Sequence, residues 1–312
     1  MKKVGIIGGS GFIGSYITKQ FLNNGFEVKV SSTDLSKKEK YHHLKTLYNA
    51  DQFTISELNV ENKEQLKTFV EDCDIVIHGG TPFQLEVEDP RRDLIDPTIK
   101  GTENFLEVVY NTPKVKKVVV IASVVAYNTN FPLPAGGNQP SDSFNENDAS
   151  FTSKESHPYA QAKFIANETV NAFINTHPNL NVEITSVSPV AVFGKSLSKR
   201  EDSVSTGLQF LIKNKLAPNP FVHMLYDTDA EMAIVNVEDV ARAVYKAASI
   251  SGLHGKNYLL SSESYPVSDV TLMLNNKAPK NQGKVIYQNH LAKRELGVPF
   301  QSVQKTLEQY NL

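Results

Sequence analysis

Short apolar segments alternate with amphipathic helical patterns over the first 190 residues of the chain. The apolar segments have the length and the Val and Ile content of strands, and they occupy residues 2–9, 26–32, 51–60, 74–80, 116–126 and 181–194. Between them, apolar residues recur at helical spacing, within residues 13–25, 61–73, 95–111 and 158–176. This alternation predicts a parallel sheet with helices on both faces, joined by right-handed crossovers.

The pattern changes after about Gly194. Residues 195–222 mix a helical pattern with irregular chain, and residues 233–250 predict a short strand that runs into a helix capped near Asn236 to Asp239. A further strand is predicted for residues 256–262 and two short helices for residues 291–310. We therefore expect two domains, 1–190 and 191–312, of which the second is smaller and interwoven with the first.

The segment GIIGGSGFIGSY places Gly8, Gly11 and Gly14 after a predicted strand and at the start of a predicted helix. In such a loop the first glycine permits a sharp turn, the second lets the backbone approach a pyrophosphate, and the third lets the helix pack on the strand. The helix N-terminus also attracts phosphate. The context predicts a dinucleotide-binding site in a Rossmann-type doubly wound α/β fold, rather than a tight structural turn. The candidate cofactor-binding residues of this loop are Gly8, Ser10, Gly11, Phe12, Ile13 and Gly14.

Composition narrows the function classes. The 312 residues carry a net charge of −2 and are 40% hydrophobic, which is typical of a globular protein and gives no sign of a nucleic-acid partner. The single cysteine, Cys73, excludes an internal disulfide and any metal site that needs two cysteines, and we expect no metal. The apolar run at the N-terminus is too short for a signal peptide, and no segment is long enough to span a membrane, so we expect a cytoplasmic protein.

Two further motifs point to catalysis. Tyr159 precedes Lys163 by four residues at the start of the predicted helix 158–176, and Ser123 lies near the end of the apolar run 116–126. Together with the glycine spacing, this Ser and Tyr-x-x-x-Lys pattern resembles the extended short-chain dehydrogenase/reductase family, also described as the NAD(P)-dependent epimerase/dehydratase family. The alternative is that Tyr159 and Lys163 are unrelated surface residues of an amphipathic helix, with no catalytic role.

The chemistry of the three residues agrees with the resemblance. A lysine one helical turn after a tyrosine lies on the same face, and its positive charge is expected to lower the tyrosine pKa. The oxidised nicotinamide ring would add further positive charge and bring the tyrosine toward the working pH, where general acid catalysis is efficient. The resemblance implies that Tyr159 protonates the substrate carbonyl, that Ser123 hydrogen-bonds the same oxygen, and that Lys163 holds the nicotinamide ribose. We expect the long loop 128–157 to fold over the substrate.

The resemblance extends over essentially the whole chain and is closest to the dihydroflavonol-reductase-like and methylglyoxal-reductase-like branch. The segments that carry it are CDIVIHGGTPFQLEVEDPRRDLIDPTIKGTENFLEVV, SPVAVFG and IVNVEDVARA. By this resemblance the cofactor would also contact Glu57, Leu58, Gly79, Gly80, Thr81, Pro189 and Val192. We interpret His78 as structural, Asn104 as a helix residue that bonds nearby backbone, and Asp239 as a helix cap.

The region after the second strand bears on the choice of cofactor. Relatives that use NAD place an acidic residue at the strand end, and Asp34 comes one or two residues late for this role. The hydroxyls of Ser32 and Thr33, followed by Lys37, could instead hold the 2′-phosphate of NADP. NADPH is therefore favoured over NAD, although Lys37 and Lys38 could also be merely solvated.

The substrate is expected to be a small uncharged aldehyde or ketone. Sugar-nucleotide enzymes of the same family commonly clamp a second pyrophosphate with C-terminal arginines, and no arginine occurs from Glu201 to Ala241. The predicted pocket residues are Phe83, Gln84, Tyr127, Phe131 and Phe221. The leading hypothesis is an NADPH-dependent carbonyl reductase, active as a monomer or homodimer. The alternatives are a sugar-nucleotide epimerase or dehydratase with tightly bound NAD, and a non-catalytic NAD(P) sensor.

Overall fold

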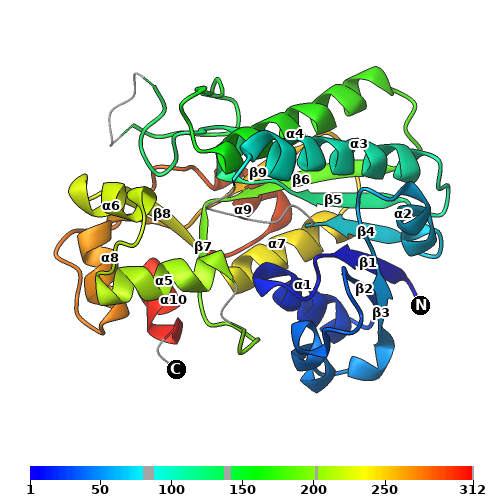
Figure 1. Ribbon diagram of the computed structural model, residues 1–312, viewed down its shortest axis with the longest axis horizontal. Coiled ribbons are helices and arrows are strands. Elements are labelled where there is room, and N and C mark those ends of the chain that lie inside the picture. Colours follow the sequence, from blue (N-terminus) through cyan, green and yellow to red (C-terminus); the bar gives the residue numbers. More distant parts are fainter. Residues whose placement is uncertain (80–87, 137–141, 201–202, 311–312) are drawn as a thin grey trace.

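Two sheets organise the computed structural model, which describes residues 1–79, 88–136, 142–200 and 203–310. In these residues the larger sheet has seven strands in the order β3-β2-β1-β4-β5-β6-β9, and all neighbouring pairs are parallel. The strands are β1 (Lys3–Ile7), β2 (Glu27–Ser32), β3 (Phe53–Glu57), β4 (Ile75–His78), β5 (Lys117–Ile121), β6 (Glu183–Pro189) and β9 (Asn257–Leu260). The predicted doubly wound Rossmann-type fold is confirmed (Figure 1).

Helices cover both faces of this sheet (Figure 1). One face carries α2 (Lys63–Val70), α3 (Asp96–Tyr110) and α4 (Pro158–Thr176), and the other carries α1 (Phe12–Asn23) and α7 (Val237–Ser249). Successive strand residues point to opposite faces, so Val76 joins the apolar cluster under α3 while Ile77 joins the cluster under α7. A strand buried on both faces reads as a continuous apolar run, which is why the sequence pattern located it.

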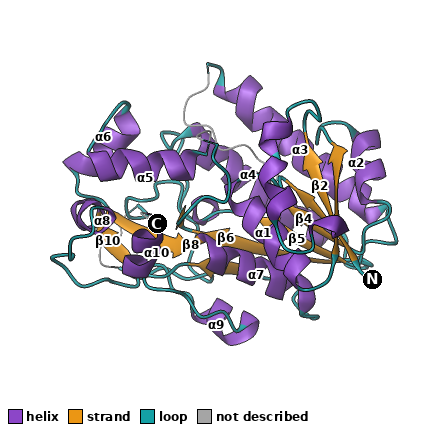
Figure 2. Cartoon of the chain, turned by 90° about the horizontal axis from the view of Figure 1, so that it is seen from below, coloured by secondary structure: helices purple, strands orange, loops and turns teal. Residues whose placement is uncertain are grey.

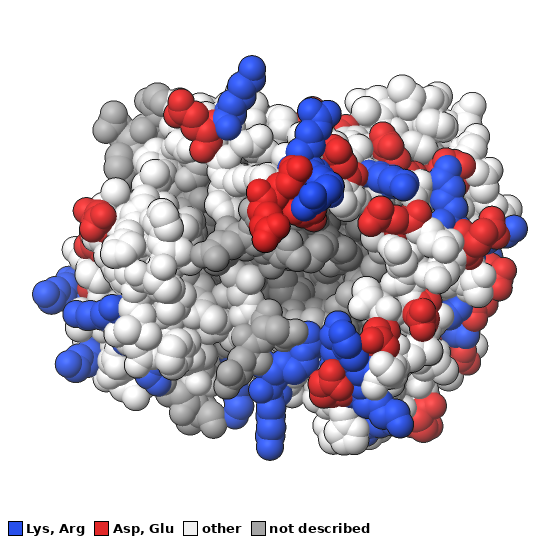
Figure 3. All heavy atoms as spheres, in the orientation of Figure 1, with Lys and Arg blue, Asp and Glu red and all other residues white. Residues whose placement is uncertain are grey.

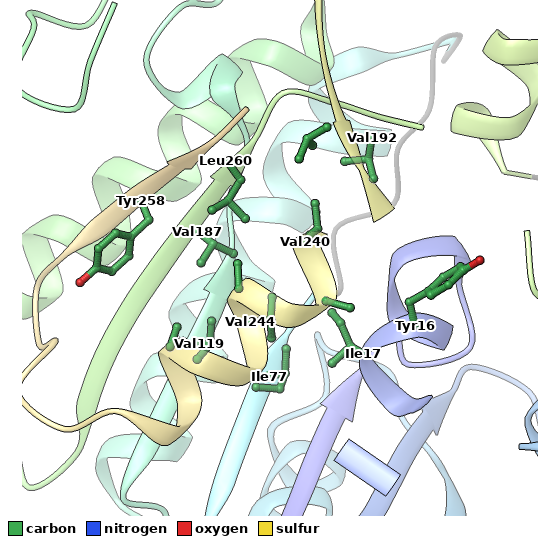
Figure 4. Packing of buried hydrophobic residues seen from close by; sticks show 14 of the residues in the cluster. Tyr16, Ile17, Ile77, Val119, Val187, Val192, Val240, Val244, Tyr258 and Leu260 are labelled. Carbon is green, nitrogen blue, oxygen red and sulfur yellow. The ribbon is translucent and has the colours of Figure 1, made fainter. Parts of the chain in front are cut away.

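The helix α7 comes from the C-terminal third of the chain and completes the core of the larger sheet. Figure 4 shows Val240 and Val244 of α7 between the sheet and α1. Both residues are fully buried and belong to one apolar cluster with Ile17, Ile77 and Val119. The strand β9, at the edge of the larger sheet, also comes from the C-terminal part of the chain, so the two parts of the chain are interwoven.

The smaller sheet lies at the other end of the molecule (Figure 2). Its strands in the described residues are β7 (Ala191–Phe193), β8 (Glu231–Asn236) and β10 (Ser264–Pro266), with β8 in the centre. The helices of this part are α5 (Val204–Asn214), α6 (Pro220–Asp227), α8 (Val267–Leu274) and α10 (Val303–Tyr310), while α9 (His290–Leu296) packs against α7 and β9. The sequence pattern predicted α5, α9 and α10 but not α6, α8 or β10.

Two predicted strands are shorter than their apolar runs. Residues 181–194 form two strands: β6 ends at Pro189 in the larger sheet, and β7 begins at Ala191 in the smaller one. Residues 116–126 form β5 only as far as Ile121, followed by the 3₁₀ turn η5 (Val124–Ala126). In both runs the residues stay apolar because they remain buried after the chain turns, so hydrophobicity alone does not reveal the break.

The structure shows the surroundings of His78, Asn104 and Asp239, for which the sequence predicted structural roles. His78 is buried against the ring of Phe105, with 4.4 Å between ring centroids, as a structural residue would be. Asn104 bonds backbone, but its Nδ2 donates to the oxygen of Glu61 on a distant segment. The helix-cap interpretation of Asp239 is wrong. Asn236 caps α7, and the Asp239 carboxylate instead accepts a hydrogen bond from the backbone nitrogen of Gln301.

Candidate active site

A cavity of about 380 Å³ lies where the two sheets meet, at the carboxyl ends of the strands of the larger sheet. Ligands of open parallel sheets bind at this edge, next to the point where the strand order reverses, here between β1 and β4. Figure 3 shows a hollow on this side of the molecule, with Lys and Arg side chains gathered along its lower edge. The cavity therefore has the position expected for a dinucleotide and its substrate.

The glycine loop forms one end of the cavity and fits a dinucleotide phosphate. Gly8 has a φ of 79°, which favours glycine, and a Cβ at Gly14 would overlap the carbonyl oxygen of Gly8. Helix α1 begins directly after Gly11, which provides no side-chain cap for the N–H groups of the first turn. These N–H groups and the positive end of the helix dipole are the ordinary partners of a phosphate.

Ser123, Tyr159 and Lys163 come together on the wall of the same cavity. Ser123 follows β5 and starts the turn η5, while Tyr159 is the second residue of α4. The Ser123 and Tyr159 side chains are hydrogen-bonded to each other. Lys163, one turn later in α4, donates from Nζ to the carbonyl oxygen of Ile121 at 3.2 Å. In the chain, Ser123 comes 36 residues before Tyr159 and 40 residues before Lys163. The positions of β5 and α4 bring the three residues together.

Burial sets the protonation of these groups. It raises the pKa of Tyr159 above the usual value of a phenol, and the hydrogen bond with Ser123 opposes this only in part. The net effect on the pKa of Tyr159 is therefore an increase, because burial has the largest influence on it. Burial also lowers the pKa of Lys163 to about 8, so that Lys163 still carries a charge at neutral pH. The same burial, together with the charge of Lys163, lowers the pKa of His78 to about 4 and keeps that imidazole neutral.

The start of α4 is held by contacts with the long loop before it. The Nδ1 atom of His157 accepts a hydrogen bond from the backbone nitrogen of Tyr159 at 3.2 Å, and Pro158 occupies the first helical position. Ser156 Oγ donates to Thr129 Oγ1 at 2.8 Å. Because His157 and Thr129 also line the cavity, this part of the loop forms a wall beside Tyr159.

The predicted cofactor residues fall into three groups. Nine of them line the cavity: Gly8, Ser10, Gly11, Phe12, Ile13, Gly14, Gly79, Pro189 and Val192. Five lie outside its described lining, at or after the carboxyl ends of β2 and β3: Ser32, Thr33, Lys37, Glu57 and Leu58. Gly80 and Thr81, together with the predicted pocket residues Phe83 and Gln84, lie outside the described residues.

The predicted cofactor residues at the ends of β2 and β3 differ in exposure and in their contacts. Thr33 and Lys37 are exposed, and Lys37 Nζ lies 3.8 Å from the carboxylate of Asp34. Hydrogen bonds from Ser36 lower the pKa of Asp34, which keeps it ionised. Leu58 is buried, and its backbone nitrogen donates to Ser32. Thr33 and Lys37 are thus exposed, whereas Ser32 is buried and its Oγ donates to the backbone oxygen of Asp34 at 3.0 Å. An acidic group therefore lies among the three predicted residues.

Of the predicted substrate-pocket residues, Phe131 and Phe221 line the cavity. Tyr127 does not belong to its described lining. Its ring is buried against Phe144, with 6.0 Å between centroids, because the chain turns at η5 and points this side chain into the core. The prediction that Tyr127 walls the pocket is therefore corrected.

Several lining residues come from segments that the sequence pattern did not single out. Apolar side chains at the far end are Leu208 and Met232, and the segment after β7 adds Ser196, Ser198 and Arg200. Arg200 directly precedes the stretch from Glu201 in which arginines were sought. Nothing local distinguishes it from a surface arginine, so only the folded chain reveals its position.

The chain matches the model of the NAD dependent epimerase/dehydratase family over residues 4–261. The chain belongs to this family. Membership agrees with the glycine loop and with the grouped Ser123, Tyr159 and Lys163. It confirms the predicted extended short-chain dehydrogenase/reductase resemblance and makes the chain an NAD(P)-dependent oxidoreductase.

Several proteins to which the chain is similar are reductases. The chain is 30% identical over 256 residues to a cinnamoyl-CoA reductase of Medicago truncatula, which covers 80% of this chain and 74% of the relative. It is 25% identical over 283 residues to an anthocyanidin reductase of Arabidopsis thaliana, covering 89% and 81%. Among solved structures, the methylglyoxal/isovaleraldehyde reductase Gre2 of yeast, complexed with NADPH, has a TM-score of 0.80 at 22% identity and covers 98% of this chain and 96% of that one.

No helix in the described residues is both long and apolar enough to cross a membrane. Within the same residues, no group of three or more His, Cys, Asp or Glu side chains could hold a metal ion.

Proposed function

We propose that this epimerase/dehydratase-family protein is an NADPH-dependent reductase that converts an uncharged aldehyde or ketone to an alcohol. The observation that carries the proposal is the hydrogen-bonded pair of Ser123 and Tyr159, with Lys163 beside it, in the same cavity as the glycine loop. The named relatives that act as reductases support the reaction type.

The side chains of the cavity have distinct roles in this reaction. NADPH, when bound, supplies the hydride. Ser123 Oγ hydrogen-bonds the substrate oxygen and stabilises the negative charge that develops there. Tyr159 donates its phenolic proton to the same oxygen, and a raised pKa keeps that proton in place until the charge forms. Lys163 contributes the positive charge that favours the resulting phenolate.

The cofactor would lie along the carboxyl edge of the larger sheet. The first turn of α1 and the glycine loop would hold the pyrophosphate, and Gly79 would pass beneath the adenine ribose and the pyrophosphate. Pro189 and Val192 would line the nicotinamide, and Glu57 and Leu58 would contact the adenine. Ser32, Thr33 and Lys37 receive the 2′-phosphate. For Lys37 this means leaving Asp34 for a stronger anion, which the separation of 3.8 Å makes easy. The yeast structure that contains NADPH supports the choice of NADP.

The substrate end of the cavity favours an apolar carbonyl compound. Beyond Tyr159 the wall is formed largely by Phe131, Phe221, Leu208 and Met232, all of which are apolar. Burial of apolar substrate surface against these side chains would supply most of the binding energy, and the Ser123 and Tyr159 hydroxyls would orient the reacting oxygen.

We extend the proposal to the organisation of the chain. Residues 1–190 would bind the dinucleotide and carry the catalytic side chains, and residues 191–312 would form the smaller substrate domain. We expect the enzyme to act in the cytoplasm as a monomer or homodimer, where its one cysteine, the buried and free Cys73, stays reduced.

The test is turnover of reduced cofactor with a panel of aldehydes, diketones and aryl ketones, followed by the absorbance of NADPH and, in parallel, NADH. We expect turnover that disappears in Tyr159→Phe but survives in Tyr127→Phe, a matched control on a buried tyrosine outside the described cavity lining. Absence of turnover with every carbonyl would overturn the proposal. Copurified NAD and tight binding of a nucleotide sugar would then indicate an epimerase or dehydratase, and weak reversible cofactor binding a sensor.

A further inference from the structure

The segment that follows β7 lies against the cofactor end of the cavity, although it leads into the smaller sheet. Its first residue after Gly194, Lys195, accepts a hydrogen bond at its carbonyl oxygen from the hydroxyl of Tyr16 in α1 at 2.8 Å. Ser196, Ser198 and Arg200 then line the cavity together with the glycine loop. This segment is therefore attached to the helix whose N-terminus faces the dinucleotide phosphates.

The guanidinium of Arg200 lies close to the first turn of α1. Its Nη1 donates to the carbonyl oxygen of Lys40 at 3.1 Å, in the turn after β2. It is also near His43, whose pKa is lowered by burial and by the charge of Arg200. His43 in turn is hydrogen-bonded through Nε2 to Ser15 Oγ at 2.7 Å, inside the first turn of α1. Arg200 is thus linked through His43 to the first turn of α1, and it lines the same cavity as the glycine loop.

We propose that Arg200 binds a phosphate group of the dinucleotide, so that the segment 195–200 closes the cofactor site from the second domain. An arginine presents five N–H donors in a planar fork that suits phosphate, so one guanidinium can serve more than one acceptor.

Two phosphates of the cofactor have the chemistry that Arg200 would recognise. The pyrophosphate would be held at the first turn of α1, where the cavity lining includes Gly11 and Arg200. The adenosine 2′-phosphate would lie near the end of β2, toward Lys40 and Lys37. Both are oxyanions within the region that Arg200 reaches, and binding of cofactor fragments can tell them apart.

The inference rests on the proposed function only in that the chain binds a dinucleotide, so the test measures binding and not turnover. Dissociation constants would be measured by calorimetry for ADP-ribose and for 2′-phospho-ADP-ribose, with the wild type, Arg200→Met and Arg200→Lys. Lys199→Met is the matched control, since it removes the same charge from the next residue, which is exposed and outside the described cavity lining.

We expect Arg200→Met to weaken binding roughly 10- to 100-fold, which is the size of a charge-assisted hydrogen bond. Arg200→Lys should recover part of the loss, and Lys199→Met should change the affinity less than about threefold. Equal weakening of both fragments assigns Arg200 to the pyrophosphate, and weakening of the 2′-phospho fragment alone assigns it to the 2′-phosphate.

Two results would overturn the inference. One is unchanged affinity of both fragments in Arg200→Met, and the other is an equal loss in Lys199→Met, which would show a general effect of charge. If the wild type itself bound neither fragment, the proposed function would fail instead, so the two failures are distinguishable.

Discussion

Lys163 donates a hydrogen bond from Nζ to the carbonyl oxygen of Ile121, the last residue of β5, at 3.2 Å. This bond fixes the lysine of α4 to the strand that ends just before Ser123. This ammonium group is buried, one helical turn after Tyr159, the proposed proton donor, and burial disfavours its charged form. Catalysis and stability should therefore depend on Lys163 in opposite directions.

The activity should decline in alkaline solution because Lys163 loses its charge. Its pKa of about 8 places the loss within the working range, while Tyr159, with a raised pKa, stays protonated there. We expect kcat/KM, which reports the free enzyme, to fall as the pH rises through about 8. Arginine stays charged throughout this range. An active Lys163→Arg variant with an unchanged alkaline decline would contradict the assignment.

Removal of the charge at Lys163 should stabilise the protein at neutral pH. The folded pKa of about 8 lies below the usual lysine value of 10.5, so the charged form is disfavoured in the folded state. The shift corresponds to about 3 kcal/mol, of which the lost bond to Ile121 offsets roughly half. Lys163→Met should therefore unfold at higher urea concentration than the wild type at pH values below about 8, and this advantage should shrink as the pH rises toward 10.5. A constant difference across that range would argue against a charged, buried lysine.

A matched pair of glycine substitutions tests the phosphate loop. Gly14→Ala places a methyl group against the backbone of Gly8, which cannot move without opening the turn. We expect the dissociation constant for NADPH to rise at least tenfold, or the protein to lose its fold. Gly207→Ala in α5 meets nothing within 4 Å and should raise the free energy of unfolding by about 0.5–1 kcal/mol. Calorimetry and thermal unfolding measure both effects, and normal cofactor binding by Gly14→Ala would disprove the packing argument.

The Asp239 carboxylate should contribute to stability and not to catalysis. It is fully buried, accepts from the backbone nitrogen of Gln301 at 2.7 Å, and pairs with Arg242 at 2.8 Å. Asp239→Ala should lower the free energy of unfolding by about 3 kcal/mol, and Glu238→Ala, on the neighbouring residue, by less than about 1 kcal/mol. Urea unfolding measures the difference. Equal effects of the two substitutions would show that the buried carboxylate contributes no more to the free energy of unfolding than its neighbour Glu238.

Much of this site was readable from local sequence. The spacing of Gly8, Gly11 and Gly14 between a strand and a helix indicates a phosphate loop because each position has its own steric reason to be glycine. Tyr159 and Lys163 lie on one helical face because four residues make about one turn. The alternation of apolar runs and helical patterns predicted the larger sheet, since buried parallel strands are apolar on both sides.

Tertiary structure decided everything that depends on segments distant in the chain. Arg200 lines the cofactor end of the cavity and Tyr127 turns away from its substrate end, because the path after β7 and the turn after β5 point them there. The pKa of Tyr159 is raised although a lysine follows one turn later, because burial has the largest influence on it. Local sequence encodes turns, periodicity and residue type, whereas desolvation and the walls of a cavity arise only when distant segments pack together.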